Sequence, residues 1–116
     1  MNNINVEFVK ELIILARQND PSFMVKFHEY FYSFVSRLNE LAITAFNCAE
    51  IEICAYTKLH FSTKEIAMYT KCSVRSVENK KYRIRKKLGL SKDVDFTLWI
   101  ASISTTKQVT VEDGKI

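Results

Sequence analysis

Residues 62–89 read STKEIAMYTKCSVRSVENKKYRIRKKLG and contain start and stop signals for two successive helices. Ser62 can cap a helix with its hydroxyl, and Glu65, three residues later, completes the spacing of a capping box. Ser73 starts a second capped segment after a short turn, and Gly89 can close that segment in a left-handed conformation. A short helix, a tight turn and a longer helix together predict a helix-turn-helix.

The longer helix, residues 73–88, has two chemically different sides. Ala67 on the shorter helix is small enough to let the two helices cross closely. Apolar residues recur at helical spacing and are predicted to face inward: Val74, Val77, Ile84 and Leu88. Polar residues are predicted on the outward and flanking faces: Arg75, Ser76, Glu78, Asn79, Lys80, Tyr82, Arg83 and Lys86. Groups that can bond to base edges are thus interleaved with cations that can neutralise phosphates.

Charge is concentrated in the same part of the chain. The whole sequence of 116 residues has a formal net charge of +4. Residues 71–92 hold nine Lys or Arg and one acid, Glu78, so this segment carries +8 and the remainder −4. Such segregation favours a polyanionic partner, because phosphates are bound mainly by Lys and Arg. A solvated helix face is the alternative that charge alone leaves open.

Composition argues against several other classes of protein. Only 2 Gly and 1 Pro are present, too few for a turn-rich sandwich or a glycine-lined phosphate loop. No run of 18 apolar residues and no secretory pattern is present, so we expect no membrane partner and a cytoplasmic protein. Cys48, Cys54 and Cys72 are expected to be buried thiols, and His28 and His60 lack ligand-like partners. We therefore expect no enzyme activity, no metal and no cofactor.

Two helices are predicted ahead of the helix-turn-helix. Residues 4–18 form the first, and its apolar stripe is Val9, Leu12, Ile13 and Ala16. The second runs from Pro21, at its first position, to about Leu41, with Asp20 as its cap. An aromatic ridge repeats along it at steps of four, four, three and four residues: Phe23, Phe27, Phe31, Phe34 and Leu38. This ridge is either an interface with a partner or core packed on the first helix, and the spacing leaves both open.

Two more helices flank the helix-turn-helix. Asn47, with Glu50 three residues on, has the spacing of a second capping box. The helix that it begins has the apolar positions Ile51, Cys54, Ala55 and Leu59. The last helix is predicted to begin near residues 91–92, with Asp93 and Asp95 in its first turn, where acids suit the helix dipole. Its apolar stripe is Phe96, Trp99, Ile100 and Ile103.

Four motifs follow one another in order: EIEIC at 50–54, FSTKEIA at 61–67, SVRSVE at 73–78 and IRKKLGL at 84–90. Together they resemble the LuxR-type helix-turn-helix domain of bacterial transcription regulators, in its Bacteroidetes-like subgroup. The resemblance implies an all-α fold with a LuxR-type helix-turn-helix four-helix domain at residues 43–104. This domain would follow an N-terminal two-helix hairpin at residues 1–42 that serves assembly, and residues 105–116 would be a polar tail.

The chain departs from the family in one loop and in helix 73–88, where Glu78 and Lys80 stand at positions that are often Lys and His in the family. The family usually places Gly before the capping Ser, whereas this chain has Leu59-His60-Phe61. A left-handed residue at that point would suit Gly better than His.

The resemblance also implies roles for individual residues, with helix 73–88 in the major groove of double-stranded DNA. Positions that approach bases are Glu78, Asn79 and Tyr82, and Lys80 and Arg83 would reach bases or backbone. Phosphate contacts are expected from Lys64, Arg75, Ser76 and Lys86. By general side-chain geometry, Asn79 is a candidate reader of adenine and Arg83 of guanine. Glu78 would accept a hydrogen bond from cytosine or hold Arg75 or Lys81 in place.

The implied function is that of a sequence-specific DNA-binding transcriptional regulator that acts as a dimer on two half-sites. Family members usually dimerise through the last helix, which here would present Phe96, Trp99 and Ile103, although Trp99 also suits core packing. A sensor protein or RNA polymerase is a further partner that the family implies. The alternative is a helical protein-interaction module that uses the aromatic ridge of residues 23–38, its basic helix binding an acidic partner or RNA.

Overall fold

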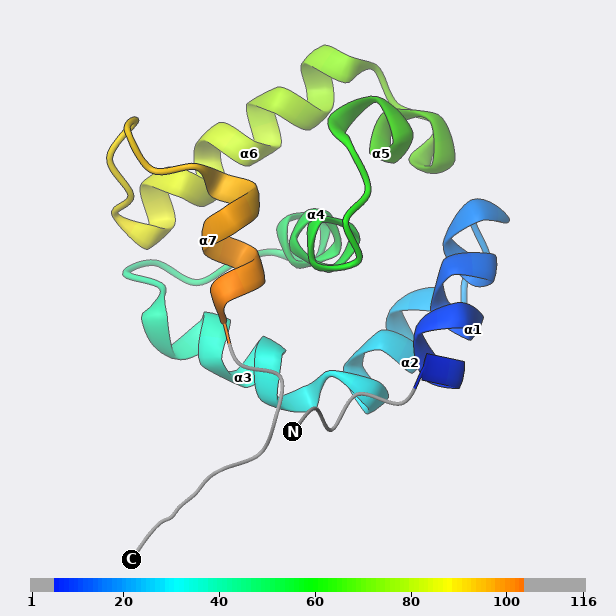
Figure 1. Cartoon of the computed structure of the whole chain (residues 1–116). Helices are drawn as coiled ribbons and strands as arrows, with labels where there is room; N and C mark the ends of the chain where they lie inside the picture. Colours follow the sequence, from blue (N-terminus) through cyan, green and yellow to red (C-terminus); the bar gives the residue numbers. More distant parts are fainter. Residues whose placement is uncertain (1–5, 104–116) are drawn as a thin grey trace, which may run out of the picture.

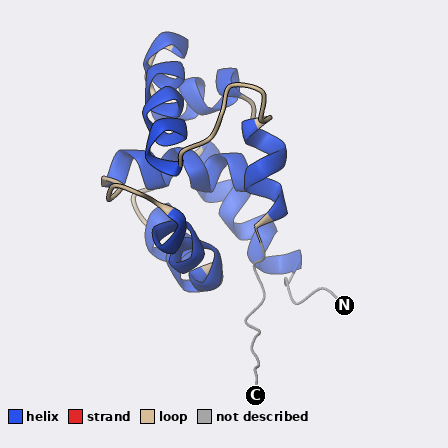
Figure 2. Cartoon of the chain, turned by 90° about the vertical axis from the view of Figure 1, so that its left-hand side faces the viewer, coloured by secondary structure: helices blue, strands red, loops and turns tan. Residues whose placement is uncertain are grey.

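The computed structural model describes residues 6–103, and over that range the chain is all-α (Figures 1 and 2). Its helices are α1 (Val6–Arg17), α2 (Phe23–Tyr30), α3 (Tyr32–Leu41), α4 (Cys48–Lys58), α5 (Thr63–Thr70), α6 (Val74–Leu88) and α7 (Phe96–Ser102). None of these helices is long and apolar enough to cross a membrane. The predicted tail at 105–116 and the first two residues of the predicted helix at 4–18 lie outside the described range.

Side-chain caps start α4, α5 and α6 where the sequence predicts them. Asn47 and Ser62 each accept a hydrogen bond from the backbone N–H of the glutamate three residues on, and that glutamate accepts one in return. Ser73 accepts from the N–H of Ser76, and Gly89 ends α6 with φ 68°. These caps satisfy backbone N–H groups that a helix start leaves unpaired, so they fix the helix boundaries locally.

The last helix starts later than predicted. Asp95 is the cap of α7, because its Oδ1 atom accepts the backbone N–H of Leu98 at 3.0 Å. Asp93 therefore precedes the helix. Arg85 holds the intervening loop, since its Nη2 atom donates to the carbonyl oxygens of Ser91 at 2.7 Å and Val94 at 2.8 Å. These hydrogen bonds from α6 satisfy two carbonyl oxygens of a loop that is not helical.

The predicted helix from Pro21 to Leu41 is wrong in two respects. It starts at Phe23, because Asp20 accepts the N–H and the hydroxyl of Ser22 at 2.8 Å each and closes a turn that contains Pro21. It is also broken at Phe31, whose backbone has φ −121° and ψ 38°. The N-terminal part is therefore three helices rather than a two-helix hairpin. The break lets α2 and α3 curve around α4 (Figure 1), so that both can bury their apolar side.

All five members of the aromatic ridge lie in the core: Phe23, Phe27, Phe31, Phe34 and Leu38. The ring of Phe23 stacks on that of Tyr56 in α4, with the centroids 4.8 Å apart. Phe27 stacks on Phe31 at 4.8 Å. The ridge thus packs α2 and α3 onto α4, and one continuous cluster of buried residues extends from Leu12 to Ile103. In this fold the ridge is not an exposed surface.

Helix α4 lies at the centre of the molecule and packs against α2, α6 and α7 (Figure 1). At the C-terminal end of α4, Lys58 contacts α3 on one side and the end of α7 on the other. Its Nζ atom donates to the carbonyl oxygen of Ile103 at 2.7 Å and lies 5.1 Å from the ring centroid of Phe34. Burial lowers the pKa of Lys58 from its ordinary value.

The loop between α4 and α5 is left-handed at His60, where φ is 71°. A glycine would adopt this conformation with less strain than His60. The turn between α5 and α6 is left-handed too, at Lys71 with φ 59°. Both positions carry side chains that a left-handed backbone disfavours, and each precedes a capping serine, Ser62 or Ser73, by two residues. The short helix, turn and long helix of the predicted helix-turn-helix are therefore present in α5 and α6 (Figure 1).

Candidate nucleic-acid interface

The outward side of α6 carries four exposed side chains at steps of four, three and four residues: Arg75, Asn79, Tyr82 and Lys86. We call these four residues the outer face of α6. Exposed Glu78 and Arg83 border it on its two sides, and Ser76 and Lys80 are half-buried. Lys64, on the exposed side of α5, completes the predicted set. The opposite side of the helix is held in the core by Val77, Ile84 and Leu88.

Val74 differs from the prediction. It is 39 % exposed rather than turned inward, because it stands in the first turn of α6, at the end of the buried row. The exposed apolar side chain of Met68 belongs to the neighbouring helix α5. Helices α5 and α6 therefore expose some apolar surface beside their cations.

Three of the nine basic residues in 71–92 donate hydrogen bonds to residues outside α6. Lys87 donates to Glu50 at 2.6 Å and to the carbonyl oxygen of Ala45 at 3.0 Å. Lys81 donates to the Thr63 hydroxyl at 2.7 Å, and Arg85 holds the loop before α7. Burial, opposed by the charges of Glu78 and Asp95, lowers the pKa of Lys81. Part of the +8 charge thus serves the fold, and the sequence could not separate these cations from the rest.

The cations of the outer face are differently placed. Within residues 6–103, no salt bridge involves Arg75, Lys86 or Lys64. The Nζ atom of Lys86 lies 5.4 Å from the ring centroid of Tyr82, which keeps the ammonium on the same exposed stripe. Their charges are available for phosphates, because no carboxylate of the described chain neutralises them at short range.

Lys80 and Arg83 lie on the side of α6 that turns toward α4. The Nζ atom of Lys80 donates to the Ser76 hydroxyl at 3.2 Å, one turn earlier. The Nε atom of Arg83 lies 3.9 Å from Oε2 of Glu50. Arg83 is still 55 % exposed, so its guanidinium reaches solvent beside the outer face.

Glu50 is the functional neighbour that the sequence reading missed. Its spacing from Asn47 predicts only its part in a capping box, but it is also a buried carboxylate beneath α6, with 1 % of its surface exposed. Burial alone would raise its pKa, but the hydrogen bond from Lys87, the N–H of Asn47 and the charges of Lys87 and Arg83 together hold that pKa below its ordinary value. Because Lys87 is 37 residues away, no local pattern could have found this pairing.

Glu78 does not take the role of a salt-bridge partner. Among the described residues, no ion pair joins it to Arg75 or Lys81. Burial lowers the pKa of Lys81, and the charge of Glu78 raises that pKa by less. The exposed Glu78 carboxylate is therefore oriented by no cation and faces solvent at the border of the outer face.

Two other predictions about exposed surface need correction. Phe96 and Ile103, expected on a dimer surface of the last helix, are buried, and Trp99 packs partly buried against the core. Leu98 is the apolar side chain that α7 exposes, at 68 %.

The cysteines also differ from the prediction. Cys48 and Cys72 are exposed rather than buried. Cys54 is buried, and burial together with the charge of Glu50 raises the pKa of its thiol to about 12.

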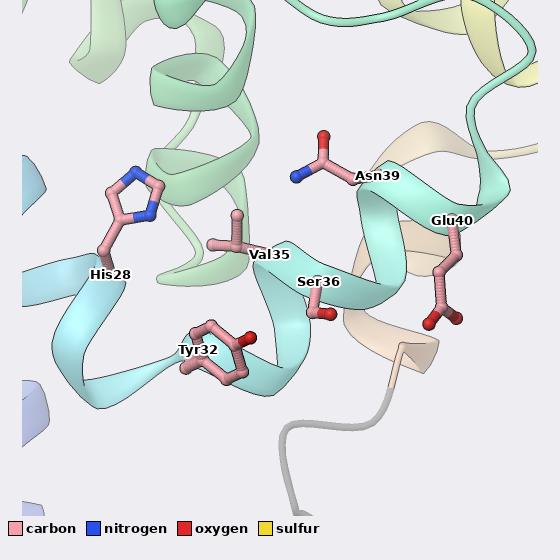
Figure 3. A pocket seen from close by; sticks show the side chains of 6 residues that line it. All are labelled: His28, Tyr32, Val35, Ser36, Asn39 and Glu40. Carbon is pink, nitrogen blue, oxygen red and sulfur yellow. The ribbon is translucent and has the colours of Figure 1, made fainter.

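A shallow groove lies on α2 and α3, away from the outer face of α6 (Figures 1 and 3). It is lined by His28, Tyr32, Val35, Ser36, Asn39 and Glu40. The side chains of Tyr32, Ser36 and Glu40 follow one another along α3, and His28 stands on α2. Glu40 pairs with Arg37 at 3.0 Å rather than with another residue of the groove. Across residues 6–103, no three His, Cys, Asp or Glu side chains are grouped as a metal site would require.

Comparisons with protein-family models, curated proteins and solved structures found no match to this chain. The arrangement of α4 to α7 and the chemistry of the outer face of α6 therefore carry the functional argument.

Proposed function

We propose that the chain is a sequence-specific double-stranded DNA-binding transcriptional regulator that places α6 in the major groove. The observation that carries this proposal is the outer face of α6, where Arg75, Asn79, Tyr82 and Lys86 are exposed on a helix anchored by its opposite side. The major groove of B-DNA is about 12 Å wide and admits one α-helix. A helix held by two caps and a buried row presents such side chains in a fixed register.

The proposed contacts divide by chemistry. Lys64, Arg75, Ser76 and Lys86 bind phosphates, which supplies affinity and position but no sequence information. Asn79 reads adenine, because its amide can donate and accept at once, and Arg83 reads guanine. Tyr82 and Lys80 contact bases or backbone, and Glu78 accepts from cytosine. Since no cation holds Glu78 in the described part of the chain, the base-contacting role is the one that its exposure favours.

We further propose that the domain is of the LuxR type, as its four motifs resemble, and that it binds as a homodimer. The order of a capped helix α4, the helix-turn-helix α5–α6 and a final short helix α7 agrees with that resemblance. Leu98 is the exposed apolar residue on α7 through which two copies would meet. A sensor protein or RNA polymerase remains a proposed partner on the same grounds.

The alternative, a protein-interaction module built on the aromatic ridge, has less support. The five ridge residues are buried in the chain's own core, so a partner could reach them only if the fold opened. RNA bound by α6 is instead the competitor in the test below.

The test is selection of bound duplexes from random DNA, followed by titration of one selected duplex at several salt concentrations. The proposal predicts an enriched sequence and an affinity that falls steeply with salt, with log K dropping by about 0.9 per phosphate contacted for each tenfold rise in salt. Single-stranded RNA of equal length is the competitor. No enriched sequence, or stronger binding to the RNA, contradicts the proposal.

A further inference from the structure

The two oxygens of the Glu50 carboxylate have unequal surroundings. Oε1 accepts two hydrogen bonds, from Nζ of Lys87 at 2.6 Å and from the backbone N–H of Asn47 at 3.0 Å. Oε2 is buried and accepts none within the described chain. A buried acceptor without a partner is unfavourable, because it has lost water and gained nothing in exchange. Glu50 is thus anchored through one oxygen and incomplete at the other.

The other cation beside this carboxylate is Arg83. Its Nε atom is 3.9 Å from Oε2, which is beyond hydrogen-bond distance. A movement of about 1 Å would close that bond. The contact is made by Nε, and neither Nη1 nor Nη2 hydrogen-bonds to a residue of the described chain. Those are the two nitrogens that a bidentate contact with guanine uses.

We propose that Glu50 is a positioning residue for base recognition: in the DNA complex its Oε2 atom accepts the Nε–H of Arg83 and turns Nη1 and Nη2 toward the major groove. The inference rests on the proposed function and adds a residue to it that does not touch DNA. Glu50 cannot follow the guanidinium, because Lys87 and the α4 cap hold Oε1. The flexible Arg83 is therefore the partner that moves. When it binds a base, its Nε–H gives Oε2 of Glu50 the hydrogen bond that this oxygen lacks.

The same position of α6 would not suit every cation. A lysine at 83 could approach Oε2 with a single ammonium but would leave no fixed pair of N–H groups for a base. Lys80, on the same side of the helix, already donates to the Ser76 hydroxyl. Arg83 can therefore bond to the Glu50 carboxylate through Nε while Nη1 and Nη2 stay free to contact a base.

The experiment measures discrimination, which is the ratio of affinities for a selected duplex and for each of its single-base variants. Parent, Glu50→Gln, Arg83→Ala and the double variant are compared as full chains. Arg83→Ala is expected to lose about tenfold discrimination at one base pair. Glu50→Gln loses discrimination at that same base pair, and the double variant is no worse than Arg83→Ala alone. The salt dependence of Glu50→Gln stays that of the parent, because no phosphate contact is removed.

Glu65→Gln is the matched control. Glu65 is the equivalent capping-box glutamate of α5, it accepts the N–H of Ser62 at 2.8 Å, and no salt bridge in the described chain involves it. A general effect of weakening a capping box would change Glu65→Gln and Glu50→Gln alike. The proposal predicts that Glu65→Gln keeps the discrimination of the parent at every base pair.

A second measurement needs no variant and so does not depend on Glu50→Gln folding. Hydrogen exchange at the Arg Nε–H groups is followed by NMR in the ¹⁵N-labelled parent, free and bound to the selected duplex. Exchange at Nε of Arg83 is expected to slow on binding by at least about tenfold more than at Arg75, which lacks a carboxylate partner. Equal exchange at the two arginines in the complex overturns the proposal.

The remaining outcomes are decisive as well. If Arg83→Ala loses discrimination and a folded Glu50→Gln keeps it, the role of Glu50 is wrong and the proposed function stands. An equal loss at all base pairs in Glu50→Gln means a structural role, and tighter binding means that Glu50 withholds Arg83 from DNA; either overturns the proposal. A parent chain without sequence preference removes both the proposed function and this inference.

Discussion

The Nζ atom of Lys87 lies 2.6 Å from Oε1 of Glu50, so an ion pair joins the last turn of α6 to the first turn of α4. The carboxylate is 1 % exposed and the ammonium side chain 22 %. Because the same glutamate caps α4 through the N–H of Asn47, one side chain fixes both the start of a core helix and the position of the basic helix. The position of the outer face of α6 therefore depends on Glu50.

This relationship predicts how stability depends on pH. The pKa of Glu50 is held below its ordinary value of 4.5, so the folded chain binds fewer protons there than the unfolded chain. The stabilisation is full above pH 4.5 and is lost as the pH falls through the lowered pKa. Glu50→Gln should lower the free energy of unfolding by about 2 kcal/mol at neutral pH, less than for a fully buried pair because Lys87 is partly exposed.

Urea unfolding of the parent and of Glu50→Gln from neutral to acid pH checks this prediction. The difference between their free energies of unfolding should narrow below pH 4.5. A difference that stays constant across that range would mean that Glu50 does not titrate as an ion-paired carboxylate.

The left-handed backbone at His60 predicts a stabilising substitution. With φ at 71°, an exposed histidine is strained, and His60→Gly should raise the free energy of unfolding by about 0.5–1 kcal/mol. Gly89→Ala is the reverse case. Its φ is 68°, and an added Cβ would lie 3.1 Å from Cδ1 of Ile43, so a loss of about 1 kcal/mol or more is expected. Thermal melts in which both variants shift in the same direction would count against this description of the two loops.

The burial of the aromatic ridge predicts that it serves stability rather than assembly. Phe27→Ala should cost about 3–5 kcal/mol in unfolding free energy, because a fully buried ring is removed from the core. Tyr32→Ala, an exposed aromatic on the next helix, should change that free energy by less than about 0.5 kcal/mol. Sedimentation is measured alongside. A Phe27→Ala chain of undiminished stability and altered oligomeric state would identify the ridge as an interface instead.

The exposed cations predict a measurable change in salt dependence. Lys86→Ala should weaken binding to all duplex sequences alike and reduce the slope of log K against log salt by about one unit. Lys10→Ala removes an equally exposed lysine from α1, outside the proposed interface, and should leave the slope unchanged. Fluorescence anisotropy at four salt concentrations distinguishes the two. Equal slopes for both variants would show that Lys86 contacts no phosphate.

Local signals in the sequence were sufficient for much of the fold. The caps at Asn47, Ser62 and Ser73 depend on residues three positions apart. The turn that ends α6 at Gly89 depends only on the absence of a side chain there. Each could therefore be predicted without tertiary information. The buried row from Val77 to Leu88 follows from helical periodicity in the same way.

Features that depend on distant contacts could not be predicted. The break at Phe31 interrupts a hydrophobic repeat that runs straight through it, because packing around α4 rather than local sequence requires the bend. The same holds for the cations, since Lys87 and Arg85 have their partners in α4 and in the loop before α7. Of the predicted site residues, the exposed outer face followed from periodicity, but the placing of Arg83 beside Glu50 did not.

If the outer face of α6 reads DNA sequence, Asn79→Ala should change which base is preferred at one position. The measurement is the affinity of parent and variant for a selected duplex and for all its single-base variants at one salt concentration. We expect Asn79→Ala to lose about 1–3 kcal/mol on the selected duplex and to relax preference at one base pair while the others are read as before. An Asn79→Ala chain that binds and discriminates every duplex as the parent does would contradict it.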